Sequence, residues 1–165
     1  MVDTAAAVIS ALRTSSDAAP VRALVMQGAA SPFGVYETGD VTDDILNGIE
    51  EARSTAKTYT KVLCLSVRDG GESPPDRQGF YMQPVSIRIY DRRRGYSGIR
   101  TVRQALVAWG KTVETLPISD GSTQGCGMLG FEYAGRTGLL VDRTYNVIYE
   151  EVRFVAKMFV SNEIA

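Results

Sequence analysis

The chain has 165 residues, of which 44% are hydrophobic and 22% are charged, and its formal net charge is -1. This composition excludes a wholly disordered chain and fits one globular domain with a single buried core, which we predict over residues 1–165. A nearly neutral protein has no overall attraction for nucleic acid or for an anionic membrane. We therefore predict no membrane partner and no sequence-specific nucleic-acid partner.

The N-terminal part of the chain predicts two helices and the start of an extended segment. Residues 5–12 contain good helix formers, with Val8, Ile9 and Leu12 on one side. Pro20 restarts the chain, and residues 21–26 form either a short helix or a strand. An extended piece begins at residues 35–36. Another helix is predicted over residues 43–52, and its apolar side consists of Ile45, Leu46 and Ile49.

The middle of the chain predicts two strands and a long helix. Residues 58–68 are rich in Thr, Val, Leu and Tyr, which fits a strand in the centre of a sheet. Apolar and polar side chains alternate over residues 84–91, as in a strand with one buried face. After a basic turn, residues 99–113 carry an apolar stripe at spacings of three and four, as on a helix. The stripe consists of Ile99, Val102, Leu106, Trp109 and Val113.

The C-terminal part predicts two further strands, over residues 128–133 and 147–160, with a turn at 134–138. One face of the last strand is mainly apolar. Glu150 interrupts that face, which we interpret as a bulge or a partner contact. Glu151 follows directly and must face the opposite side of the sheet, so the two glutamates are not expected to form a carboxylate dyad.

Strands and helices do not alternate strictly along the chain. We therefore predict an α+β fold, in which a mainly antiparallel β-sheet has two or three α-helices packed on one face. Its core should join two strands to the long helix, through Val85, Ile87, Ile89, Val102, Leu106, Trp109, Val152, Phe154 and Met158.

The chain contains no histidine. This removes the commonest general base, the commonest metal ligand and every Ser-His or Cys-His nucleophile pair. We predict no catalytic residues, no metal site and no cofactor. The two cysteines, Cys64 and Cys126, form no Cys-x-x-Cys motif. Cys64 lies in an apolar run, where we favour a buried thiol over a disulfide. No stretch approaches the ~20 apolar residues of a membrane span, so we expect a soluble protein that folds in a reducing cytoplasm.

Two polar, Gly-rich segments are predicted to be exposed loops, at residues 69–79 and 117–127. The first contains Gly-Gly and Pro-Pro pairs and no apolar residue, so it is not expected to bury its backbone. We predict that this loop contacts partner proteins through Asp69, Gly70, Gly71, Glu72, Asp76 and Arg77.

Charged residues gather in a basic turn at 92–94 and in an acidic segment at 40–51. The acidic segment has no Asp-x-Asp-x-Asp-Gly loop, so its pattern does not indicate a metal site. Each segment alone is typical of a solvated turn or helix. Between two subunits, however, opposite charges would set the register of the contact more than its affinity. The predicted subunit-interface residues are Arg92, Arg93, Arg94, Asp43, Asp44, Glu50 and Glu51.

The order of these elements resembles that of the tail-completion or tail-terminator proteins of long-tailed bacteriophages. In that family a short Ala/Leu helix precedes a Val-Tyr extended segment and a strand. A longer strand, a basic turn, a helix and a long C-terminal strand follow. The matching pieces here are residues 5–12, 35–36, 62–67, 85–94, 99–109 and 149–159.

The resemblance implies a structural virion protein with no catalytic step. It implies a ring of identical subunits, usually a hexamer, that caps the tail tube and joins it to the neck and head. The protein would be made in the host cytoplasm and located at the tail–neck junction of the virion. Its partners would be the tail tube protein and a neck or head-completion protein, and the genome would pass through the ring.

Two alternatives to a tail terminator remain open. One is another head–tail neck protein, such as a connector or stopper. The other is a small α+β ligand-binding module or enzyme whose site lies between the two Gly-rich loops.

Overall fold

The structure is a computed structural model that describes residues 4–26, 34–70, 80–92, 97–113 and 126–160. The α-helices are α1 (Thr4–Thr14), α2 (Ala19–Arg22), α3 (Asp43–Ala56) and α4 (Ser97–Thr112), with short 3-10 turns η1 (Ser16–Ala18) and η2 (Thr38–Asp40). The strands are β1 (Val35–Glu37), β2 (Cys64–Asp69), β3 (Phe80–Asp91), β4 (Cys126–Arg136), β5 (Leu140–Asp142) and β6 (Val147–Val160).

The six strands of the described residues belong to one sheet, in the order β1-β2-β3-β6-β4, and β5 also pairs with β6. The β1–β2 pair is parallel and the other pairs are antiparallel. The longest pairing joins β3 to β6, from Phe80 opposite Phe159 to Asp91 opposite Ile148. This arrangement confirms the predicted α+β fold with a mainly antiparallel sheet.

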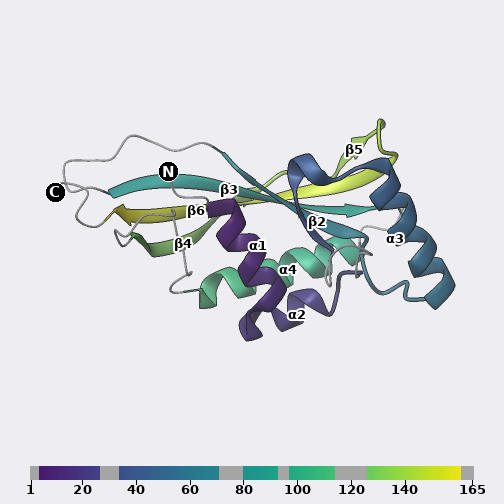
Figure 1. Cartoon of the computed structure of the whole chain (residues 1–165), viewed down its shortest axis with the longest axis horizontal. Helices are drawn as coiled ribbons and strands as arrows, with labels where there is room; N and C mark the ends of the chain where they lie inside the picture. Colours follow the sequence, from purple (N-terminus) through teal and green to yellow (C-terminus); the bar gives the residue numbers. More distant parts are fainter. Residues whose placement is uncertain (1–3, 27–33, 71–79, 93–96, 114–125, 161–165) are drawn as a thin grey trace.

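Helices α1, α2 and α4 lie together on one face of the sheet, as Figure 1 shows. They share one apolar core with the strands, and this core contains the predicted residues whose side chains the structure describes. These are Val85, Ile87, Ile89, Val102, Leu106, Trp109, Val152 and Phe154, all of them buried. The side chain of Met158, which we also predicted in the core, lies outside the described part of the protein.

Helix α3 packs separately, at one end of the sheet (Figure 1), over a second and smaller apolar cluster. Leu46 and Ile49 of α3 contact strand residues such as Cys64 and Tyr90 there. Alternation along the strands explains the two clusters, since Leu65 and Ile89 belong to the main core while their neighbours point the other way. Cys64 is a free, fully buried thiol, as predicted, and burial raises its pKa to about 12.

The strand predicted over residues 58–68 begins only at Cys64, because α3 extends to Ala56, beyond the predicted end at residue 52. Lys57 then caps α3 in the left-handed conformation, with its N–H donating to the Arg53 carbonyl. Residues 58–63 turn back from the helix, and within them Val62 forms an isolated parallel bridge with Val25. The ambiguous segment 21–26 is therefore the end of α2 followed by this bridge.

The predicted turn at 134–138 is wrong in its first half, because residues 134–136 belong to β4. Gly135 has a φ of +121° and lies at a register shift in the pairing of β4 with β6, so it forms a β-bulge within the strand. Strand β5 was not predicted, because three residues are too few to show a period. Thr137 then connects the two strands along β6, with its N–H donating to the Glu151 carbonyl.

Both predicted loops are shorter than expected where the structure describes them. Asp69 is the last residue of β2 and pairs with Val85, while the Gly70 N–H donates to the Pro84 carbonyl over 2.8 Å. Residues 126 and 127 of the second predicted loop belong to β4. Residues 71–79 and 114–125 lie outside the described part of the protein.

Replacing Leu106 with Ala should destabilise the protein by about 2–5 kcal/mol, because it leaves a cavity between α4 and the sheet. Leu106 is fully buried in the main core. The free energy of unfolding, measured by urea denaturation, tests this expectation. Val141→Ala is the matched control because Val141 is 66% exposed, and equal stability losses in the two variants would contradict the described packing of α4.

Candidate interaction surfaces

Arg92, predicted to contact another subunit, binds α3 of its own chain. Its guanidinium donates to the side-chain oxygen of Asn47 over 2.6 Å and to Glu50 over 2.9 Å. It also donates to the backbone carbonyl of Tyr145 over 3.0 Å and lies 3.8 Å from the Asp43 carboxylate. The structure thus brings the predicted basic and acidic segments together within one chain, and Arg92 holds α3 against the sheet.

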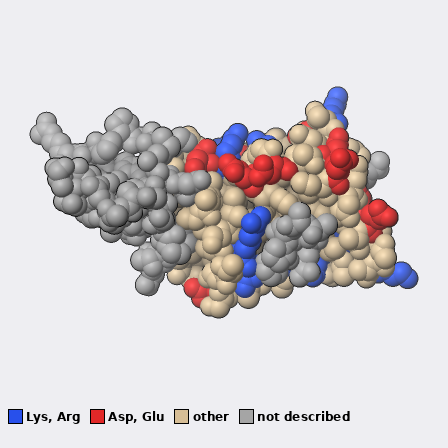
Figure 2. Space-filling model, viewed as in Figure 1, with Lys and Arg blue, Asp and Glu red and all other residues tan. Residues whose placement is uncertain are grey.

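Apart from Asp43 and Glu50, the predicted interface residues are not brought together in this way. Asp43, Asp44 and Glu51 of α3 are exposed, and Glu50 is half-buried. Figure 2 shows acidic side chains at several places along the upper part of the molecule and at the end where α3 lies. Their role between subunits stays a prediction. Arg93, Arg94, Gly71, Glu72, Asp76 and Arg77 lie outside the described residues.

A buried ion pair between Arg53 of α3 and Asp91 of β3 was not predicted. The guanidinium of Arg53 donates to Asp91 over 2.7 Å and to the Lys61 carbonyl over 3.2 Å. The side chains of Arg53 and Asp91 are 2% and 0% exposed. One signal for this pair is present in the sequence, since Arg53 follows Leu46 and Ile49 on the apolar side of the helix.

Glu150 and Glu151 lie on opposite faces of the sheet, as predicted. Glu150 is fully buried on the α4 side, where Arg103 of α4 donates to both of its oxygens over 2.9 and 3.2 Å. Arg136 of β4 lies 3.6 Å from the same carboxylate. Of the two interpretations of Glu150, a bulge or a partner contact, the bulge is wrong, because β6 keeps its register with β3 there. The residue interrupts the apolar face because it forms ion pairs with α4 and β4.

On the opposite face of the sheet, three arginines surround Glu151, and we call Arg68, Arg88 and Arg153 the arginine cluster. One Glu151 oxygen lies 3.2 Å from Arg88 and 3.6 Å from Arg68, and the other lies 3.1 Å from Arg153. The strand register creates this arrangement, since Arg88 lies opposite Glu151 and Ser86 lies opposite both Arg68 and Arg153.

The arginine cluster holds Glu151 in its charged form. Burial alone would raise the pKa of Glu151, but hydrogen bonds from Arg88 and Arg153 and the charges of Arg88 and Arg68 outweigh it, so the pKa lies below 4.5. Arg88 is fixed further by the Tyr149 ring, 4.9 Å from its guanidinium carbon. In this cluster three guanidinium groups therefore share one carboxylate. The cluster was not predicted, because it depends on which strands pair and in what register.

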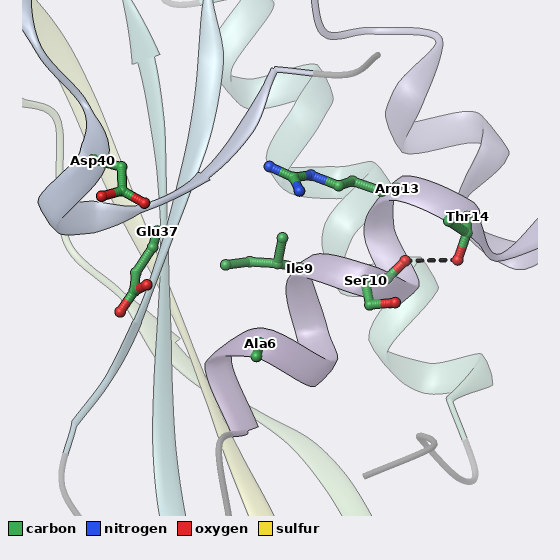
Figure 3. Close-up of a pocket in the computed structure, with 7 residues that line it drawn as sticks. All are labelled: Ala6, Ile9, Ser10, Arg13, Thr14, Glu37 and Asp40. Atoms are coloured by element: carbon green, nitrogen blue, oxygen red, sulfur yellow. Dashed lines mark hydrogen bonds between the residues drawn. The ribbon is translucent and has the colours of Figure 1, made fainter. Parts of the chain in front are cut away.

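Beside α1 there is a shallow hollow of about 450 Å³ between this helix and the β1–η2 segment (Figure 3). Arg13 points into it from α1, and Glu37 and Asp40 line its other side. Arg13 donates to the Val35 carbonyl over 3.1 Å, and the Thr14 hydroxyl donates to the Ser10 carbonyl over 2.7 Å. The Arg13 bond joins α1 to β1, whereas the Thr14 bond lies within α1, and no nucleophile–base hydrogen bond is found among the lining residues.

Strand β5 and Leu139, the residue before it, present apolar side chains to solvent. Leu139, Leu140 and Val141 are 43%, 40% and 66% exposed, although Leu140 and Val141 pair with β6. Within the described residues, no group of three or more Cys, Asp and Glu side chains is placed to hold a metal ion, and no helix is long and apolar enough to cross a membrane.

Replacing Arg92 with Ala should destabilise the protein by about 1–3 kcal/mol, because Glu50 and the Tyr145 carbonyl lose their charged donor. Urea denaturation measures the change. Arg143→Ala is the control because Arg143 is exposed in the turn before β6. Unchanged stability of the Arg92 variant would contradict its role in holding α3.

The Glu151→Gln variant should be less stable than the parent chain at pH 7 and should depend less on pH in the acid range. Because the pKa of Glu151 is lowered by folding, its contribution is present above its unfolded pKa, near 4.5, and is lost as the pH falls through the folded pKa. The two stability curves should therefore converge below pH 4.5. Thermal unfolding between pH 2.5 and 7 measures this, and parallel curves would contradict it.

No protein-family model matches the chain, and no curated protein matches its sequence. Among solved structures, its fold is similar to a chain described as "Virion of native gene transfer agent (GTA) particle". The two chains are 18% identical with a TM-score of 0.52, and the match covers 93% of this chain and 92% of that chain. At this identity the likeness shows a shared fold, which extends over nearly the whole of both chains.

Proposed function

We propose that the protein is a structural component of a phage-like virion and that it acts as a tail terminator. The observation that carries this proposal is the fold likeness to a chain of the gene transfer agent virion, which covers nearly all of both chains. The order of elements resembles tail-terminator proteins independently of that comparison. In this role the protein forms a ring of identical subunits, which we expect to be a hexamer, and catalyses no reaction.

The ring caps the tail tube and joins it to the neck at the tail–neck junction. Its partners are the tail tube protein and a neck or head-completion protein, and the genome passes through its centre. The exposed apolar residues of β5 support an assembly role, because exposed apolar patches commonly mark association surfaces. A neighbouring neck protein, a connector or stopper, is the second candidate, since it would show the same virion fold likeness.

Assembly state and position in the particle test the proposal together. The purified protein, alone and after co-expression with the tail tube and neck proteins of its own gene cluster, is examined by analytical ultracentrifugation and negative-stain electron microscopy. We expect rings that bind the end of tail tubes. Rings that bind only the head vertex would favour the connector or stopper role. A protein that stays monomeric with both partners and is absent from particles would contradict the proposal.

Replacing Val141 with Lys should weaken assembly while leaving the monomer folded, because this 66% exposed side chain makes few contacts within the chain. The stability change should stay within about 0.5 kcal/mol, as for most surface substitutions. Tyr59→Lys is the matched control, since Tyr59 is an exposed apolar residue far from β5 in sequence. Sedimentation measures assembly, and equal behaviour of both variants would remove β5 from the association surface.

A further inference from the structure

We propose that the arginine cluster of one subunit binds the exposed face of α3 on the next subunit. The inference rests on the proposed ring and names the two surfaces that join its subunits. It differs from the interface expected from the sequence, because Arg92 is engaged within its own chain and the available positive charge lies elsewhere.

The arginine cluster has more positive charge than Glu151, its acidic partner among the described residues, neutralises. Both oxygens of Glu151 are already in ion pairs, and this carboxylate is only 7% exposed. Arg68 and Arg153 are 53% and 54% exposed, and Glu151 is the acidic partner of each among the described residues. Each guanidinium carries five N–H donors, so several remain directed to solvent. Glu151 thus holds in place a surface with two excess positive charges.

The exposed face of α3 carries the matching charge. Asp44, Gly48 and Glu51 follow one another at spacings of four and three, so they lie along one side of the helix, and all three are exposed. Two carboxylates seven residues apart on a helix are separated by about 10 Å along its axis. This separation would let each carboxylate pair with one of two arginines, Arg68 and Arg153, which lie on either side of Glu151. Asp43 and Glu50, on the neighbouring side of α3, are ion-paired with Arg92 instead.

Gly48 leaves the middle of this face without a side chain. Glycine in the middle of an exposed helix is unfavourable relative to alanine. Nothing within the described chain requires it, since a Cβ built at Gly48 would meet no atom within 4 Å, and its φ is not positive. A side chain at position 48 would project between Asp44 and Glu51. Its absence leaves room for the long stems of two arginines that reach the two carboxylates.

A second copy of this chain provides a partner of opposite charge for both surfaces, since it carries the arginine cluster and the acidic face of α3. Phosphate groups would also bind arginines, but they would be repelled by the carboxylates of α3 and would leave the space at Gly48 unexplained. The cluster lies on the sheet and α3 lies at its end, so each subunit offers two different patches. Contacts between unlike patches are the kind that close a ring.

Charge reversal in both directions tests the pairing. Arg68→Glu with Arg153→Glu, and separately Asp44→Arg with Glu51→Arg, should raise the protein concentration needed for half-assembly by about tenfold or more. Joining all four changes in one chain restores opposite charges and should recover most of the assembly. Lys111→Glu with Arg143→Glu alters the net charge equally at exposed sites elsewhere and should have little effect. Sedimentation measures assembly, and circular dichroism melting confirms that each variant is folded.

Neutral variants keep the test decisive if a reversal unfolds the chain. Arg68→Gln with Arg153→Gln, and Asp44→Asn with Glu51→Gln, should each weaken assembly in a salt-dependent way. Gly48→Ala should raise the melting temperature, whereas Gly48→Leu should fold but assemble poorly.

Several results would overturn this inference while leaving the proposed function intact. One is normal assembly of the folded Arg68 and Arg153 double variants, when the wild-type chain forms rings. Another is no recovery of assembly in the variant that carries all four charge reversals. A third is normal ring formation by Gly48→Leu. If the Arg68 and Arg153 variants lose binding to a labelled DNA duplex but still form rings, the cluster binds nucleic acid, and the proposed contact with α3 is overturned as well. Absence of wild-type rings with all virion partners present would instead contradict the proposed function.

Discussion

The antiparallel pairing of β3 with β6 is the contact on which the rest of the structure depends. It runs along the whole of β3, from Phe80 to Asp91. Because side chains alternate, this one register places Ile87 and Val152 in the core and Arg88 and Glu151 on the opposite face. A slip by one residue would exchange the two faces and bury the arginines. The core and the charged surface are therefore set by the same hydrogen bonds.

Each of the longer helices is positioned by a polar contact in addition to its apolar side. Thr4 of α1 bonds Gln83 of β3, Arg53 of α3 pairs with Asp91, and Arg103 of α4 pairs with Glu150. Apolar faces alone allow a helix to slide or rotate. Buried charged pairs add little net stability because of their desolvation cost, but their directed bonds favour one orientation. We interpret these contacts as the features that fix how the helices lie on the sheet.

The sequence was sufficient to predict an element where apolar residues recur regularly over many positions. Strand β3, helix α4 and strand β6 were found from alternation and from the apolar stripe, and with them the main core. It was insufficient where local patterns are short or tertiary contacts decide, as for β5, the bulge at Gly135 and the start of β2. The charged residues were the hardest. Arg92 looks like a solvated turn residue, and only the approach of α3 makes it a structural one. Prediction of the arginine cluster would have required the pairing register of three strands, and the amino-acid sequence alone does not show this register.

The position of Trp109 has a practical consequence for biophysical work. It is the only tryptophan in the chain, it is 3% exposed, and its ring meets Phe131 edge-on with 5.7 Å between centroids. Its indole N–H is buried and has no hydrogen-bond partner among the described residues. Its fluorescence emission therefore reports the docking of α4 against β4, in the interior and away from β5, α3 and the arginine cluster. Folding has an intrinsic optical signal that is separate from any signal of subunit association.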